Sequence, residues 1–374
     1  MPQLLSEIAS LEDSSEDRVW HVSWHPKGTH LAAAGEDKVV RIYASATGDW
    51  GEKDSIHCIS TLEDAQTRTV RCCEWSPNGK MIACASFDGT VVVWETRDAS
   101  LMHWDQVASL DGHENEVKSV AWSPVGFWVA TCGRDKKVWI WEQERGSEFE
   151  CVSMLDGHTQ DVKFITWHPT EAILLSCGYD DTIKIWKEDD EEFFCSETLD
   201  GHADTVWGMT MNKESEGKQM ISSCADGCLK LWECDGAHGQ GQWRCIHTLA
   251  EVHRFPVYSV HWGSHYIASG GGDNDIALLR IVNHEEAEGG SKLEVVEGGR
   301  VKQAHSGDVN CVRFGPVVTV GDGGGERGRD IDGGMELETA FRVTQTGAPA
   351  LPCHRVLASC GDDGAVRLWR LDMC

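Results

Sequence analysis

The segment ATCGRDKKVWIW, residues 130–141, contains the pattern that decides the fold: an Asp followed six residues later by an aromatic or bulky residue. The same pattern returns along the whole chain as DKVVRIY, DGTVVVW, DKKVWIW, DDTIKIW, DGCLKLW, DNDIALL and DGAVRLW. These segments end at Tyr43, Trp94, Trp141, Trp186, Trp232, Leu279 and Trp369. Successive ends are 51, 47, 45, 46, 47 and 90 residues apart, the last being one period plus an insertion. A period of this length indicates a repeat protein.

A second element precedes the pattern in each repeat. It reads DRVWHVSW, RTVRCCEW, NEVKSVAW, QDVKFITW, DTVWGMTM, FPVYSVHW and GDVNCVRF, and the alternation of β-branched and small residues predicts strands. The fourth repeat offers four short strands: VKFITW (162–167), ILLSCG (173–178), TIKIW (182–186) and FCSETL (194–199). Four strands every 45 or so residues is the period of a β-propeller blade, so we predict an all-β, seven-bladed propeller.

The two ends of the chain predict how the ring closes. LLSEIASLED (4–13) resembles a fourth strand that lacks its own blade, whereas the last repeat stops at RLDMC without one. We therefore expect the N-terminal strand to complete the last blade and leave no open edge. One domain should span 1–374, with repeats near 14–45, 65–96, 112–143, 157–188, 201–234, 252–281 and 304–371. Residues 316–352, rich in Gly around GDGGGERGRDIDGG, are expected to be a disordered insertion in the last blade.

Composition excludes several classes of function. With 61 acidic and 33 basic residues, the formal net charge is −28, the wrong sign for a general binder of nucleic acids or anionic membranes. No run of eighteen apolar residues and no signal peptide is found, so we expect a soluble intracellular protein. The 16 Cys include no C-x-x-C pair, and Cys224 and Cys228 are four residues apart. We interpret them as small buried residues and expect no disulfides, metal site or cofactor.

Glycine–histidine pairs and the terminal tryptophans identify the repeat. Gly112-His113, Gly157-His158 and Gly201-His202, together with a Trp at the end of most repeats, resemble the WD40 family over nearly the whole chain. In that family a His, a Ser or Thr, an Asp and a Trp form a buried hydrogen-bonded network in each blade. The resemblance implies four complete sets here: His113, Thr131, Asp135 and Trp141; His158, Ser176, Asp180 and Trp186; His202, Ser222, Asp226 and Trp232; His305, Ser359, Asp363 and Trp369.

These sets are expected to serve the fold rather than catalysis. A buried carboxylate needs hydrogen-bond donors, and imidazole, hydroxyl and turn N–H groups supply them. A catalytic triad would occur once in a cleft, whereas this set recurs in blade after blade. Repeats one and two lack the His, with Gln66 nearest to its place in repeat two, and repeat six has Leu279 for Trp, so those networks should be incomplete. We predict that the chain is not an enzyme.

Two positions differ from one repeat to the next and take no part in the hydrogen-bonded network. They are the residue before the turn Asp and the residue after the first Val of the inner strand. In WD40 propellers both surround the channel mouth on the face where partners often bind. By analogy we assign to a partner-binding surface Arg134, Trp20, Arg71, Phe87, Lys118, Lys163, Tyr179, Trp207 and Tyr258. Basic and aromatic side chains predominate there in a strongly acidic chain, which suits an acidic or carboxylate-ending peptide. For any single residue, a solvated side chain is an equally good interpretation.

The residues of repeats three and four indicate one branch of the family. DGHENEVKSVAWSPVGFWVATCGRDKKVWIWE, with TVWGM and EVHRFPVYSVHW further on, resembles the WD40 proteins of the cytosolic iron–sulfur assembly machinery. The resemblance implies a scaffold that joins a DUF59-type subunit and a HEAT-repeat adaptor to deliver clusters to cytosolic and nuclear apoproteins. Some clients end in acidic-aromatic tails, and a functionally important Arg of the family lies where Arg134 stands here. We expect a cytoplasmic protein that binds neither nucleic acid nor membrane directly, with a nuclear pool left open.

Two other classes of function remain open from the sequence. WETR (94–97) is close to a box found in substrate receptors of cullin-type ubiquitin ligases, although Glu replaces its Asp and only one copy occurs. A chromatin-associated scaffold is the other alternative, which the acidity of the chain disfavours.

Overall fold

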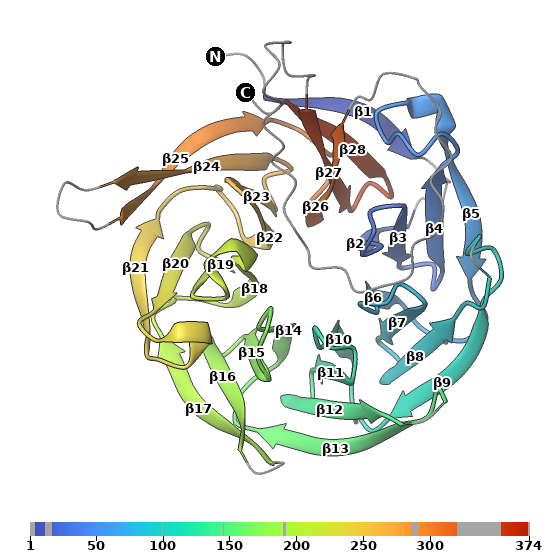
Figure 1. Cartoon of the computed structure of the whole chain (residues 1–374), viewed down its shortest axis with the longest axis horizontal. Coiled ribbons are helices and arrows are strands. Elements are labelled where there is room, and N and C mark those ends of the chain that lie inside the picture. The colour runs from blue at the N-terminus through green and yellow to red at the C-terminus, as the bar shows by residue number, and fades with distance from the viewer. Residues whose placement is uncertain are drawn as a thin grey trace, which may run out of the picture.

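Seven antiparallel sheets of four strands each are arranged around a central axis, as in a seven-bladed propeller (Figure 1). The structure, a computed structural model, describes residues 4–11, 17–98, 100–144, 146–189, 192–285, 291–319 and 353–372. In this part of the chain, the only helical elements are three short 3-10 turns: η1 (Lys53–Ser55), η2 (Lys213–Ser215) and η3 (Ala237–Gly239). None of the described helices could cross a membrane. The predicted all-β propeller is thus confirmed.

In blades one to six the four strands run from the channel outward in chain order, and each strand pairs with the next one along the chain. The inner strands are β2 (Val19–Trp24), β6 (Val70–Trp75), β10 (Val117–Trp122), β14 (Val162–Trp167), β18 (Val206–Met211), β22 (Val257–Gly263) and β26 (Val309–Thr319). The second strands are β3 (His30–Gly35), β7 (Met81–Ser86), β11 (Trp128–Gly133), β15 (Ile173–Gly178), β19 (Gln219–Cys224), β23 (Tyr266–Gly271) and β27 (Cys353–Gly361).

The outer half of each blade follows the same order. The third strands are β4 (Val40–Ser45), β8 (Thr90–Glu95), β12 (Lys137–Gln143), β16 (Thr182–Asp189), β20 (Leu229–Cys234), β24 (Ile276–Glu285) and β28 (Val366–Asp372). The outermost strands are β5 (Ile56–Leu62), β9 (Asp105–Asp111), β13 (Phe149–Asp156), β17 (Glu192–Asp200), β21 (Trp243–Leu249), β25 (Ser291–Val301) and β1 (Leu5–Leu11). Blades one to seven are numbered from the inner strands β2 to β26.

The N-terminal strand completes the last blade, as predicted. Strand β1 pairs antiparallel with β28, with Leu5 opposite Leu371 and Leu11 opposite Val366. Blade seven therefore has the strand order β1-β28-β27-β26, and both ends of the described chain lie in one sheet. Hydrogen bonds between the first and last segments hold the ring closed.

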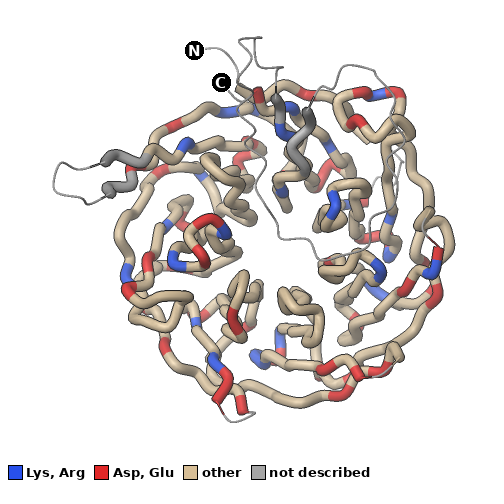
Figure 2. Tube along the Cα trace, in the orientation of Figure 1, with Lys and Arg blue, Asp and Glu red and all other residues tan. Residues whose placement is uncertain are grey.

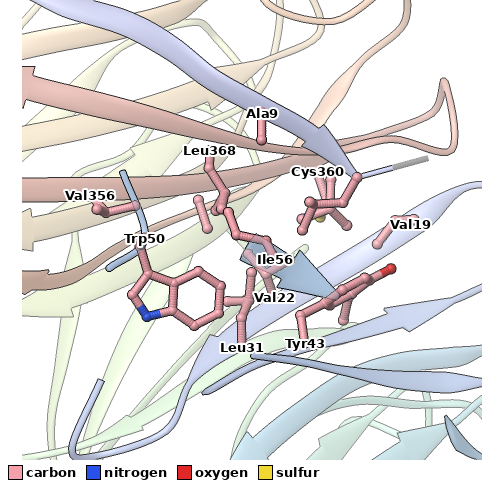
Figure 3. Close-up of a cluster of buried hydrophobic side chains, with 14 of the residues drawn as sticks. Ala9, Val19, Val22, Leu31, Tyr43, Trp50, Ile56, Val356, Cys360 and Leu368 are labelled. Atoms are coloured by element: carbon pink, nitrogen blue, oxygen red, sulfur yellow. The ribbon is translucent and has the colours of Figure 1, made fainter. Parts of the chain in front are cut away.

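The core consists of apolar side chains packed between neighbouring blades. Figure 3 shows one such cluster, in which Trp50, Leu31 and Tyr43 of blade one meet Leu368 and Val356 of blade seven. All five are almost completely buried, and the indole N–H of Trp50 donates to the carbonyl of Gly28 at 2.9 Å. Burial of the sheets against each other, rather than within one blade, explains why the ring is the folding unit.

The insertion in blade seven is shorter at its start than the sequence predicted. Strand β26 continues to Thr319, which lies opposite Cys353, so residues 316–319 belong to the sheet rather than to the insertion. The register shifts between Phe314 and Val317, and this bulge accommodates Pro316, which has no N–H for the ladder. β-branched Val317, Val318 and Thr319 then resume the pairing. The remainder of the predicted insertion, 320–352, lies outside the described residues.

Candidate partner-binding site at the channel mouth

A β-bulge at the start of every inner strand builds the site. In each blade the pairing between first and second strands skips the residue after the first Val, for example between Val117 and Ser119 and between Val162 and Phe164. The skipped residues are Trp20, Arg71, Lys118, Lys163, Trp207, Tyr258 and Asn310. A bulged residue is released from the ladder and its side chain is re-aimed. The variable position found in the sequence is thus the position that the backbone frees from pairing.

These side chains converge on the channel. A cavity there is lined by five of the predicted residues, together with His21, Asn310 and Arg313 of blades one and seven. The five are Arg71, Lys118, Lys163, Trp207 and Tyr258. The structure therefore brings together residues that are up to 187 positions apart in the chain, from blades two to six.

Lys163 lies at the centre of an aromatic group. Its Nζ is 3.6 Å from the ring centroid of Tyr179 and 4.8 Å from that of Trp207. The Trp207 ring in turn meets Tyr258 edge to face, with 5.0 Å between centroids. Burial, followed by the charge of Lys118, lowers the pKa of Lys163 to about 7. The ammonium group is thus held over aromatic faces at a site where its charge is poorly solvated.

Arg71 and Lys118 also lie over aromatic rings. The Arg71 guanidinium is 5.1 Å from the Trp20 centroid, and Lys118 Nζ is 4.2 Å from that of Phe87. The indole N–H groups of Trp20 and Trp207 are buried and have no hydrogen-bond partner among the described residues. Unpaired donors beside cations favour a ligand that brings hydrogen-bond acceptors and negative charge.

Arg134 and Asp135, adjacent in the turn between β11 and β12, face different surroundings. The Asp135 side chain is 6% exposed, and its Oδ2 accepts from His113 Nδ1 at 2.7 Å. The Arg134 side chain is 58% exposed, and its only ion pair in the described structure is a 3.7 Å contact with Glu116. Glu116 also pairs with Lys118 at 2.5 Å, so it holds Arg134 weakly. Arg134 is therefore available to a partner, whereas Asp135 is committed to the fold.

Arg134 also lies close to the neighbouring blade. Burial raises the pKa of Tyr179, and the Arg134 guanidinium acts in the opposite direction, which places its charge near that ring. Seven of the nine predicted residues take part in the cation–ring contacts of Lys163, Arg71 and Lys118. Of the other two, Tyr258 adjoins Trp207, and Arg134 shares Glu116 with Lys118. Acidic residues are spread over the rest of the ring, many on its outer rim (Figure 2).

Behind this surface, hydrogen-bonded networks cross blades three, four and seven. The His Nδ1 to Asp distances are 2.7 Å for His113, 2.8 Å for His158 and 2.8 Å for His305. Each Nε2 meets the hydroxyl of Thr131, Ser176 or Ser359 at 2.7–2.9 Å. The same hydroxyls accept from the indole N–H of Trp141, Trp186 or Trp369 at 2.8–3.0 Å.

The remaining blades deviate in different ways. In blade six, His253 contacts Asp273 at 2.7 Å and Ser269 at 2.8 Å, so only the Trp is missing. In blade two, Gln66 replaces the His and donates to the Cys84 carbonyl at 2.7 Å. In blade one, Asp37 pairs with Arg41 at 2.7 Å instead.

Blade five corrects one part of the sequence prediction. His202 Nε2 contacts Ser222 at 2.6 Å and Trp232 donates to Ser222 at 2.8 Å, as the pattern implied. Nδ1 of His202, however, has no hydrogen-bond partner among the described residues, and Asp226 is exposed. The predicted His202–Asp226 bond is therefore absent.

A signal for this difference was present in the sequence. The residue two before the turn Asp is Gly in five blades and Ser86 in blade two, but Cys224 in blade five. A Cβ at this place would lie against the imidazole in blades three, six and seven, at Gly133, Gly271 and Gly361.

One group of possible metal ligands near the channel is not suited to hold a metal ion. His21, Cys72 and Glu74 approach one another near the channel, but Nδ1 of His21 is 3.0 Å from the Cys73 carbonyl and Nε2 is 3.0 Å from Arg313. Both ring nitrogens are thus engaged, and a guanidinium occupies the space that a cation would need. All cysteines with described side chains are free thiols.

Known proteins resemble this chain over nearly its whole length. The family model "WD domain, G-beta repeat" matches residues 5–44, 56–95, 104–142, 149–187, 193–233 and 349–370. The chain is 40% identical to "Probable cytosolic iron-sulfur protein assembly protein CIAO1 homolog" of Chlamydomonas reinhardtii, over 99% of both chains. It is 35% identical to the protein of the same name from Schistosoma japonicum, over 98% of both. It is 38% identical to "Protein CIA1" of Arabidopsis thaliana, over 98% of this chain and 96% of that protein. The chain therefore belongs to the WD40-repeat family, within its branch of CIAO1-type cytosolic iron–sulfur protein assembly proteins.

Proposed function

We propose that this protein is a non-catalytic scaffold in cytosolic iron–sulfur protein assembly, and that its channel mouth binds acidic-aromatic or carboxylate-ending segments of other proteins. The names of its relatives support the process, and full-length similarity supports the transfer. The observation that carries the binding role is the surface formed by Arg71, Lys118, Arg134, Lys163 and their aromatic neighbours in a chain of net charge −28. The iron–sulfur cluster is cargo of the process rather than a resident cofactor in this proposal.

The geometry of the surface suits such a ligand in two ways. A carboxylate can take the place of Glu116 at Arg134, whose side chain is 58% exposed. An aromatic side chain can extend the edge-to-face series of Tyr179, Trp207 and Tyr258. Arg and large aromatic residues are the types that dominate binding free energy at protein interfaces.

The partners are part of the proposal. A DUF59-type subunit and a HEAT-repeat adaptor are expected to join the propeller, with iron–sulfur apoproteins of cytosol and nucleus as clients. The protein would act in the cytosol, and nuclear clients would place a fraction in the nucleus. A role as receptor of a cullin-type ubiquitin ligase is not favoured, because the relatives carry assembly names.

The test separates binding from folding. Wild type, Arg134→Glu and Asp135→Ala are compared by affinity purification with mass spectrometry, and by anisotropy with a labelled peptide ending in an acidic-aromatic carboxylate tail. We expect Arg134→Glu to keep its melting temperature and to bind at least about tenfold more weakly, since a favourable charge becomes a repulsive one. Asp135→Ala should instead lower stability by about 1–3 kcal/mol.

A matched control is Arg244→Glu. Arg244 has a 69% exposed side chain on the outer strand β21, paired only with Asp235 in the described structure. It should bind the peptide and the partners normally. If Arg134→Glu unfolds the protein or binds as tightly as wild type, the assignment of Arg134 is wrong; if no assembly partner copurifies with wild type, the proposed process is wrong.

A further inference from the structure

Blade five contains an imidazole nitrogen that the fold leaves unused. In blades three, four, six and seven, the corresponding Nδ1 lies 2.7–2.8 Å from an Asp carboxylate. His202 is only 9% exposed, yet its Nδ1 has no hydrogen-bond partner in the described structure. A buried polar atom without a partner costs free energy, so it indicates either strain or a missing ligand.

Cys224 explains why the usual partner is displaced. Its counterparts in blades three, six and seven are Gly133, Gly271 and Gly361, and a Cβ built on them would lie 3.3, 3.2 and 3.0 Å from the histidine Nδ1. Any side chain at this position therefore lies against the imidazole, in the space beside the His–Asp bond. In blade five that side chain is a buried thiol, and Asp226 is exposed instead of meeting His202.

Cys228 brings a second thiol from the other side of the turn. The position two after the turn Asp is Thr90 in blade two and Thr182 in blade four, and both hydroxyls donate inward to the Asp, at 2.7 and 2.9 Å. Cys228 occupies the same place and is 6% exposed. As a result, a ring nitrogen of His202 and the Sγ atoms of Cys224 and Cys228 all lie within 4.8 Å of one another. Because Nε2 is hydrogen-bonded to Ser222, Nδ1 is the nitrogen left for a metal.

The hydrogen bonds of Ser222 allow the His202 tautomer that metal coordination needs. If the Ser222 hydroxyl donates to the Lys230 carbonyl at 3.5 Å, its oxygen accepts the Nε2–H of His202 at 2.6 Å. In that tautomer Nδ1 has a lone pair for a metal ion. A histidine ligand held by a hydrogen bond from its other nitrogen is the usual arrangement at zinc sites.

We propose that His202, Cys224 and Cys228 form a binding site for a zinc-like divalent cation in blade five. Cys224 and Cys228 lie at the turn between β19 and β20, and His202 lies in the loop before β18. One nitrogen and two sulfur donors match the preference of Zn²⁺, with a water or the nearby Asp226 carboxylate in the fourth position. At Zn–S and Zn–N bond lengths of about 2.3 and 2.0–2.1 Å, tetrahedral ligand atoms lie about 3.5–3.8 Å apart, so bound metal would draw the three donors closer together.

Binding would require the thiols to lose their protons. The Sγ–H of Cys224 donates to the carbonyl of Asp204 at 3.3 Å in the metal-free structure, and this contact would be exchanged for the metal.

The experiment uses the full chain, purified with a phosphine reductant and stripped of metal. Co²⁺ is titrated first, since a thiolate-bound tetrahedral cobalt ion gives a charge-transfer band and intense visible absorption. Zn²⁺ is then added in competition with a chromophoric chelator. We expect one equivalent of Co²⁺ to bind and one equivalent of Zn²⁺ to displace it.

The chain itself supplies the diagnostic variants. Cys224→Gly restores the residue of the other blades and Cys228→Thr restores that of blade four, so both should fold with the network of a normal blade. Each should lose the charge-transfer band and weaken zinc binding by more than the roughly 10- to 100-fold that loss of an outer-shell partner causes. Cys245→Ser, which removes an exposed thiol of strand β21 in the same blade, should bind metal like wild type.

Three outcomes would overturn the proposal: wild type that binds neither metal, Cys224→Gly that keeps the cobalt band, or an effect of Cys245→Ser equal to that of Cys224→Gly. A mass loss of two hydrogens that maps to Cys224 and Cys228, without metal binding, would assign the pair to a disulfide and also overturn it. The site is distinct from the Arg134 surface, so its test does not depend on the proposed function.

Discussion

Blades four and five carry the same four residue types at nearly the same spacing, but they form different structures. The sets are His158, Ser176, Asp180 and Trp186 in blade four, and His202, Ser222, Asp226 and Trp232 in blade five. In blade four, Asp180 accepts from His158 and from the N–H of Thr159 at 2.8 and 2.9 Å, whereas in blade five Asp226 is exposed and Nδ1 of His202 is unpaired. The blades differ at the residue two before the Asp, Gly178 or Cys224. The comparison shows that a small residue at this place is as much a part of the motif as the four residues that form the bonds.

The largest expected effect is a stability difference between Asp180→Ala and Asp226→Ala. Removal of Asp180 leaves the ring N–H of His158 without its acceptor, and the His158 side chain is 0% exposed, so the change should cost about 2–3 kcal/mol. Asp226 is exposed and accepts from the backbone N–H of Cys228 within its turn, so its removal should cost less than about 1 kcal/mol. Urea unfolding in the presence of a chelator measures both. Equal losses would contradict the difference between the two blades.

Low pH should destabilise the protein through the intact His–Asp networks of blades four and six. Hydrogen bonds from His158 lower the pKa of Asp180 against the effect of burial, and those from His253 lower the pKa of Asp273 to about 2. A carboxylate with a lowered folded-state pKa adds stability that is complete above its unfolded value near 3.8 and is lost as pH falls toward the folded value. We expect the melting temperature to fall between about pH 4 and pH 2, and to fall less steeply in Asp180→Asn. A flat profile down to pH 2 would show that these bonds contribute little.

A repair of blade five should have a smaller, opposite effect. The double variant Cys224→Gly, Cys228→Thr gives blade five the turn residues of blade four and should allow Asp226 to meet His202. One restored hydrogen bond to a charged group should stabilise the metal-free protein by about 1 kcal/mol. Urea unfolding with chelator is the measurement, and a control is Cys245→Ser. A less stable double variant would mean that Cys224 does not displace the Asp.

The smallest effect that we expect is a pH dependence of peptide binding, which arises from a difference between the inner strands of blades four and five. Blade four presents Lys163 and blade five presents Trp207, and the pKa of Lys163 is lowered to about 7 by burial and by the charges of Lys118 and Arg71, against the opposite effects of Asp161 and Glu116. The ammonium form therefore declines as pH rises through 7, and affinity for an acidic peptide should fall a few-fold between about pH 6 and pH 9. Lys163→Met should bind more weakly and without this pH dependence in anisotropy titrations. A wild-type affinity that rises with pH would contradict the role of Lys163.

Much of this architecture could be predicted because the same residue pattern occurs seven times along the chain. The seven blades and the ring closed by β1 follow from hydrophobic alternation at a regular period, and the structure confirms both. The surface residues could be selected as the positions where repeats disagree. The bulge that frees Trp20, Lys163 and their equivalents was not predicted, because register depends on how two strands pair and not on either strand alone. The end of β26 at Thr319 was missed for the same reason, since its partner Cys353 lies beyond the insertion.

The number of blades and the closure of the ring could be predicted from the order of residues alone. The same is true of the contrast between Asp135, which recurs in other repeats, and Arg134, which does not. Periodicity and recurrence are properties of the residue order. The folded structure was needed to show that Lys163 lies over the rings of Tyr179 and Trp207, that Arg134 is exposed beside Glu116, and that His202 lies near two thiols rather than bonded to Asp226. These contacts join residues 16 or more positions apart in the chain. Which of the possible hydrogen bonds form depends on how closely the backbone and side chains pack in the folded protein.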